Sequence, residues 1–112
     1  MDGNNTQPVA VSNTESIPGR TIVEFYGVVT GNTVRAKHVG RDIMAGLKNI
    51  VGGELKGYTE LLQDSRAEAT ERMIAQAVSM GANAVVNVRF ATSSISQGAA
   101  ELFAYGTAVR VR

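Results

Sequence analysis

The clearest pattern of apolar and polar residues lies between Val39 and Gly53, where apolar side chains recur at helical spacing. Charged and polar residues such as Arg41 and Lys48 take the other side. The paired glycines at 52 and 53 are typical of a helix end, because glycine tolerates the left-handed conformation that closes a helix. We therefore predict an amphipathic helix over 39–51. Its apolar positions are Val39, Ile43, Met44, Leu47, Ile50 and Val51.

A second and longer apolar pattern of helical period follows a short connector at 54–57. It predicts a helix from Tyr58 to Met80, ended by Gly81. Acidic and basic residues alternate over the rest of its surface, so we expect a solvated, salt-linked outer face. The apolar stripe consists of Leu62, Ala69, Met73, Ala77 and Met80, widened by Ile74 and Val78.

β-Branched and aromatic residues are concentrated before the first helix. The run Thr21–Thr30 predicts a strand, and Gly31-Asn32 is typical of a two-residue turn into a second strand at Thr33–Lys37. Both faces of the first strand are apolar, so a single layer of helices would leave one face uncovered. This surplus favours a partner subunit. One predicted face carries Val23, Phe25 and Val29, and the other carries Ile22, Tyr26 and Val28.

The C-terminal third predicts two further strands. Apolar residues alternate with Asn87 and Arg89 from Ala84 to Phe90, and a second apolar run extends from Leu102 to Val111 after a polar loop at 92–101. The predicted order is a β-hairpin, two helices and then two antiparallel strands, with the helices packed on one face of a sheet. This order is an α+β fold.

Composition fits one globular domain. The chain has 112 residues, 44% hydrophobic and 19% charged, and no apolar run approaches the roughly 20 residues of a membrane span. Residues 1–17 are polar and predict a flexible tail without a secretory signal, so the domain spans 18–112 and a cytoplasmic location is expected. A net charge of +1 and 5% aromatic residues favour neither nucleic acid nor membrane as a partner.

Candidate catalytic chemistry is sparse. The chain has no cysteine, which removes disulfides, thiolate nucleophiles and thiolate metal sites. A Ser–His–Asp arrangement would need the single histidine, His38, and no serine follows the pattern of a nucleophile elbow near it. We therefore expect a protein that is not an enzyme.

Several of these segments together resemble a known family. The segments are GRTIVEFYGVVTGN at 19–32, GRDIMAGLKNIVGGELKGY at 40–58, MGANAVVNVRF at 80–90 and YGTAVRV near the end. They resemble the YbjQ-like family, which carries a heavy-metal-binding label. The resemblance implies a small bacterial cytosolic protein with a dodecin-like subunit that assembles into a homo-oligomeric ring, most often a pentamer.

Possible ligands for a divalent or soft metal ion are few. His38 and Asp42 stand four residues apart, a spacing that places both on one helix face, although a histidine at a helix start explains His38 as well. Arg41 could meet a small anion or pair with Asp42. Met44, Met73 and Met80 are better explained as core residues than as Cu(I) ligands. We expect Tyr26, Val28 and Tyr58 at or near a subunit contact or ligand.

Two functions remain open on these residues. In the first, the oligomer binds a metal ion or a small anionic ligand where subunits meet. In the second, it is a homo-oligomeric scaffold for protein interactions without a small ligand.

Overall fold

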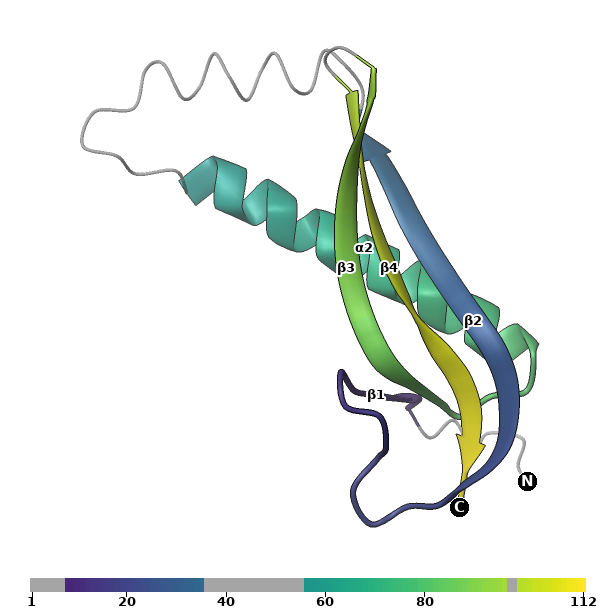
Figure 1. Cartoon of the computed structure of the whole chain (residues 1–112). Helices are drawn as coiled ribbons and strands as arrows, with labels where there is room; N and C mark the ends of the chain where they lie inside the picture. The colour runs from purple at the N-terminus through teal and green to yellow at the C-terminus, as the bar shows by residue number, and fades with distance from the viewer. Residues whose placement is uncertain (1–7, 36–55, 97–98) are drawn as a thin grey trace.

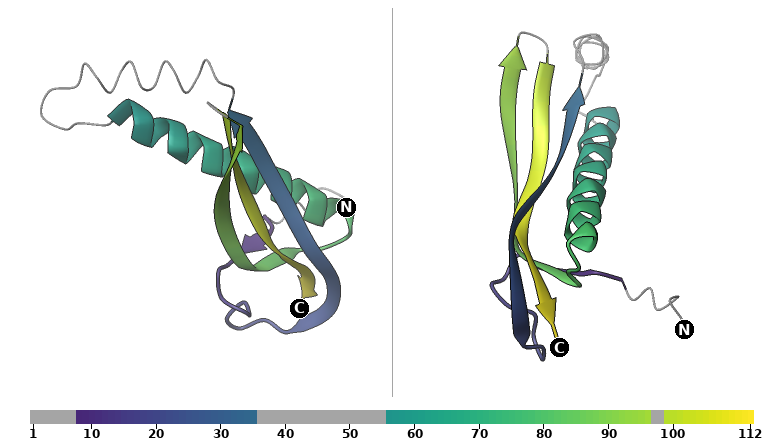
Figure 2. Two further views of the ribbon diagram at one scale, coloured as in Figure 1. Left: turned by 45° about the horizontal axis from the view of Figure 1, so that its top comes forward. Right: turned by 90° about the vertical axis from the view of Figure 1, so that its right-hand side faces the viewer.

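The computed structural model describes residues 8–35, 56–96 and 99–112. They form a mixed four-stranded sheet with one long helix across one of its faces, as Figure 1 and the right-hand view of Figure 2 show. The elements are β1 (Ala10–Val11), β2 (Ile22–Arg35), α2 (Lys56–Ser79), β3 (Ala84–Ser96) and β4 (Ala99–Val111). The strand order is β1-β3-β4-β2; β1 pairs with β3 in parallel, and β4 is antiparallel to β3 and β2.

The predicted dodecin-like subunit, with a hairpin, two helices and two strands, is wrong. The described elements follow the order β-β-α-β-β in a mixed sheet. Residues 22–35 form one continuous strand, in which Gly31 and Asn32 pair with Ala104 and Phe103 instead of turning the chain. The residues of the predicted loop at 92–101 that the structure describes likewise belong to β3 and β4. The helix predicted over 39–51 lies outside the described residues.

The long helix is confirmed. α2 ends at Ser79, and Gly81 follows with a φ of 95°, which is the left-handed conformation expected at a helix end. Ala69, Met73 and Ala77 are fully buried, as their helical spacing predicts. Despite its length, α2 is too polar to cross a membrane, and no other described helix is a candidate.

Gly31 explains why helix and strand approach so closely. A Cβ atom at this position would collide with the carbonyl oxygen of Ala69 and the amide nitrogen of Met73. Glycine is therefore present because the backbone of α2 passes directly over β2, and not because the chain turns. The core between the sheet and α2 includes Val29, Met73, Val85, Val88, Ala104 and Ala108.

The strand around Asn87 departs from simple alternation. The pairing of β3 with β4 shifts between Val86 and Arg89, and Asn87 has a φ of 56°. This bulge places Val86 and Val88 in different clusters, although two-residue alternation predicts one face for both. Val88 faces α2, whereas Val86 lies on the opposite side of the sheet.

A second, smaller core lies on the side of the sheet away from α2. Ala10 and Ile17 pack against its members, which are Ala84, Val86, Val109 and Val111. The segment predicted as a flexible tail thus contributes β1, and beyond it Ser12 exchanges backbone hydrogen bonds with Val85 and Val88. Figure 1 shows this segment beside the lower end of β3.

Candidate functional site

Most of the residues predicted to bind a ligand lie outside the described part of the chain. This holds for His38, Arg41 and Asp42, and for the side chain of Tyr58, whose backbone belongs to α2. Tyr26 and Val28 are described, and both belong to β2.

The structure separates Tyr26 from Val28. The register of β2 shifts between Phe25 and Gly27, and Tyr26 at this shift packs against the core under α2. Val28 is 70% exposed. It pairs with Thr107 on the side of the sheet away from α2. The prediction that Val28 shares a face with Tyr26 is therefore wrong, because the bulge inverts the alternation between them.

Exposed apolar side chains gather on that side of the sheet. Phe25 is 73% exposed, and Val34 is 54% exposed. Tyr105 on the neighbouring strand is 37% exposed and packs beside Phe103, with the ring centroids 6.0 Å apart. Several exposed large apolar side chains on one sheet face are typical of a protein contact. We call the surface formed by Phe25, Val28, Val34, Phe103 and Tyr105 the open face.

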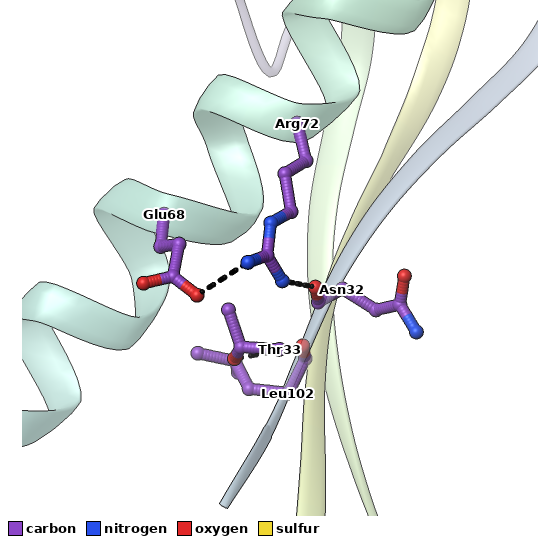
Figure 3. A network of polar contacts seen from close by, with 5 residues as sticks. All are labelled: Asn32, Thr33, Glu68, Arg72 and Leu102. Carbon is purple, nitrogen blue, oxygen red and sulfur yellow. Dashed lines mark hydrogen bonds and ion pairs between the residues drawn. The ribbon is translucent and has the colours of Figure 1, made fainter.

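A polar network joins α2 to the outer edge of β2 (Figure 3). The Arg72 guanidinium forms an ion pair with Glu68 at 2.9 Å and donates a hydrogen bond to the backbone carbonyl of Asn32 at 2.5 Å. One turn further along the helix, the Gln76 side-chain oxygen accepts a hydrogen bond from the backbone N–H of Thr30 at 2.8 Å. The helix thus bonds to two main-chain groups of an edge strand.

A second polar group lies across the three long strands. The Asn32 side-chain amide donates to the Glu101 carboxylate at 2.7 Å, and the Ser93 hydroxyl is 3.4 Å from the other oxygen of that carboxylate. One carboxylate with an amide and a hydroxyl is a weak donor set for a metal ion. Within residues 8–35, 56–96 and 99–112, no three His, Cys, Asp or Glu residues come together as metal ligands would.

Sequence reasoning missed the roles of Asn32, Arg72 and Gln76. The sequence predicts Asn32 in a turn and Arg72 on the solvated, salt-linked face of the helix, and it predicts no role for Gln76. A signal was present, because Glu68, Arg72 and Gln76 stand four residues apart and each directly precedes a member of the buried stripe. A row of long polar side chains next to the buried stripe of a helix borders the contact between helix and sheet, and its side chains can reach the edge of that sheet.

Comparison with known proteins gives the family. A family model described as "Putative heavy-metal-binding" matches residues 9–112. The chain belongs to the YbjQ family. The resemblance found in the sequence is thereby confirmed over nearly the whole chain.

Two relatives of this YbjQ family protein match it along almost their full length. A UPF0145 protein of Hahella chejuensis is 73% identical over 99 residues, covering 88% of this chain and 95% of the relative. A UPF0145 protein of Archaeoglobus fulgidus is 64% identical over 104 residues, covering 93% and 96%. The names of these relatives state no activity, substrate or ligand.

A solved structure shares the fold. It is the crystal structure of a protein with unknown function of the DUF74 family from Pediococcus pentosaceus, with a TM-score of 0.56 and 14% identity. The alignment covers 91% of this chain and 96% of that one. At this identity, the likeness bears on the fold alone.

Proposed function

We propose that this protein is a noncatalytic, cytoplasmic homo-oligomer that binds a metal ion or a small anionic ligand where its subunits meet. A ring is the favoured assembly, with five subunits as the expected number. The proposal has two parts, a subunit contact and a ligand site, and they rest on different observations.

The subunit contact is supported by the open face. Phe25 and Val28 are both more than two-thirds exposed, although aromatic and β-branched residues in a strand normally pack against a neighbour. Burying a side chain of this size contributes about 1.5–3 kcal/mol. A second subunit covering the open face would therefore gain most from these two residues.

The ligand site is supported by the family description and by the sequence. His38 and Asp42 are the proposed metal ligands, and Arg41 is the proposed contact for an anion. Two side chains do not complete the four ligands typical of a structural metal site, so symmetry-related copies would supply the rest. A site of this kind exists only in the assembled protein.

Native mass spectrometry of the protein as purified, without added metal or chelator, tests both parts in one spectrum. A ring that carries a stoichiometric extra mass supports ligand binding and identifies the class of ligand. A ring without extra mass supports the scaffold function described below. A monomer refutes the subunit contact.

Two matched variants make the test specific. Val28→Asp places a charge on the open face and is expected to lower the assembly mass, whereas Val78→Asp on exposed α2 surface is the control. For the ligand, replacing both His38 and Asp42 by alanine should weaken metal binding in calorimetry at least several-fold. Glu101→Ala, which removes a carboxylate remote from the proposed site in sequence, should leave binding unchanged.

The alternative function is a homo-oligomeric scaffold for protein interactions. The open face itself favours this candidate, because its apolar and aromatic composition suits a protein partner better than an ion. Under this hypothesis, ligand screens stay blank and a pull-down recovers a partner that the monomeric Val28→Asp variant loses. Retained metal in the native spectrum would argue against it.

A further inference from the structure

In the part of the chain that the structure describes, the outer edge of β2 is protected by side chains of α2 and not by its own sequence between Gly27 and Val34. Among the described residues, β2 has β4 on one side and no strand on the other. Its evenly paired part runs from Gly27 to Arg35. The first eight of these residues, GVVTGNTV at 27–34, contain neither a charged residue nor proline, and Arg35 ends the strand. Lysine, proline and bulges are the usual protections of an edge, and the two register shifts of β2 both lie before this segment.

The groups that an incoming strand would use can be identified. Along an antiparallel edge, alternate residues direct both their N–H and C=O groups away from the neighbouring strand. Thr30 and Asn32 are two residues apart, and each has a main-chain group bonded to α2 instead of β4. They are therefore the outward-directed residues at the middle of this edge.

We propose that the Val28–Val34 edge of β2 is a strand-addition site for a second copy of this chain, held closed by Gln76 and Arg72 of α2. Gln76 occupies the Thr30 N–H and Arg72 occupies the Asn32 carbonyl, so a pairing strand must displace both side chains. The ion pair with Glu68 holds the Arg72 guanidinium in place for this contact.

The occupant is a second copy because each copy presents the same uncharged segment, Val28–Val34, at this edge. Two identical strands pair antiparallel about a two-fold axis, so Val28–Val34 of one chain meets the same segment of the other. The segment combines β-branched residues with zero charge, the composition that favours strand association. Gln76 and Arg72, which we call the guards, are surface side chains of α2. Rotation of these side chains withdraws them from the edge without unfolding the helix.

The test compares two double variants that change composition and charge identically. Arg72→Ala/Gln76→Ala removes the guards, and Gln63→Ala/Arg66→Ala removes the same residue types from exposed positions earlier on α2. Alanine favours helix at all four positions. Light scattering coupled to size-exclusion chromatography measures the assembly mass of each variant over a range of concentrations. Each mass is compared with that of the wild-type assembly, whatever its number of subunits.

The guard-free variant is expected to reach at least about twice the wild-type mass, whereas the control keeps it. Adding Thr30→Pro should restore the wild-type mass, because proline removes an edge N–H that β4 does not use. A guard-free variant of unchanged mass overturns the proposal. A rise shared by the control, or one that Thr30→Pro leaves in place, overturns it as well.

Amide exchange gives an independent readout if the double variant fails to fold. Gln76→Ala should speed exchange of the Thr30 amide at least about five-fold, whereas Gln76→Glu keeps an acceptor and should preserve protection. Unchanged Thr30 exchange in Gln76→Ala would show that the guard is absent. None of these comparisons depends on a bound ligand or on the open face, so the proposed function can fail while this inference stands.

Discussion

Replacing Gly31 by alanine tests whether the close approach of α2 to β2 sets the stability of the fold. Gly31 is buried, and an added Cβ would overlap the backbone of Ala69 and Met73. The carbonyl carbon of Arg72 would be a further 2.9 Å neighbour. These atoms belong to the helix main chain and cannot rotate away as a side-chain end would. The helix must therefore move off the strand.

The cost can be assembled from two effects. Overpacking a core typically costs about 1–3 kcal/mol. A helix displaced from β2 also loses its hydrogen bonds to Thr30 and Asn32, each about 1 kcal/mol net. The expected total is about 3–5 kcal/mol, a large share of the 5–15 kcal/mol typical of a domain. The melting temperature should fall by an amount on the order of 10–20 °C.

Chemical denaturation at one fixed protein concentration measures this loss. Gly19→Ala is the matched control, because Gly19 has a φ of 78° and its added Cβ would meet nothing within 4 Å. That variant should lose only about 1–2 kcal/mol through backbone strain. If Gly31→Ala were no less stable than Gly19→Ala, the contact between α2 and β2 would not be as tight as the structure shows.

Five further substitutions at four positions can be measured in the same way. Met73→Ala should cost about 2–5 kcal/mol, because the side chain is fully buried; an exposed metal ligand would cost far less. Asn83→Ala should cost about 1–3 kcal/mol, because its amide bonds both main-chain groups of Val111 at 2.7 and 3.0 Å. Asn87→Gly should stay within about 0.5 kcal/mol of wild type, whereas Asn87→Val should lose about 1–2 kcal/mol at the positive φ. Ile17→Ala should cost about 1 kcal/mol if residue 17 packs on the second core, and nothing if it belongs to a flexible tail.

The helix was predictable because its evidence is local. The period of Ala69, Met73 and Ala77 and the glycine at 81 depend only on neighbours within a few turns. Val78 was misassigned to the stripe and is 53% exposed. Whether a residue that flanks the stripe is covered depends on where the strands lie, and the helix sequence does not determine this.

β2 was misread because a glycine can serve two purposes. Gly31-Asn32 fits a hairpin turn by composition, yet here the glycine admits the helix backbone and Asn32 continues the strand. Only a contact across about forty residues distinguishes the two cases. The bulge at Tyr26 likewise leaves no clear local signal, and it reverses which face each following residue occupies.

The candidate site was predicted least well for the same reason. Val28 is exposed as the apolar surplus suggested, but its partner Tyr26 lies on the other side of the sheet. The edge contacts of Arg72 and Gln76 depend on the position of β2 under the helix. The charge pattern of the helix therefore predicts only a solvated position for Arg72 and no role for Gln76. Residues that act across elements need the fold before their roles can be stated.

On the sheet face away from α2, apolar residues are covered at one end and exposed at the other. Near the chain termini, the N-terminal segment covers the small core with Ala10 and Ile17. Beyond the reach of that segment, Val28 and Val34 stay exposed on the same surface. The chain therefore covers one end of this apolar sheet face by itself and leaves the side chains at the other end exposed. The edge beside these exposed residues is bonded to Gln76 and Arg72 of α2, and cover by a helix is one of the ways in which an edge strand is kept from pairing with another chain.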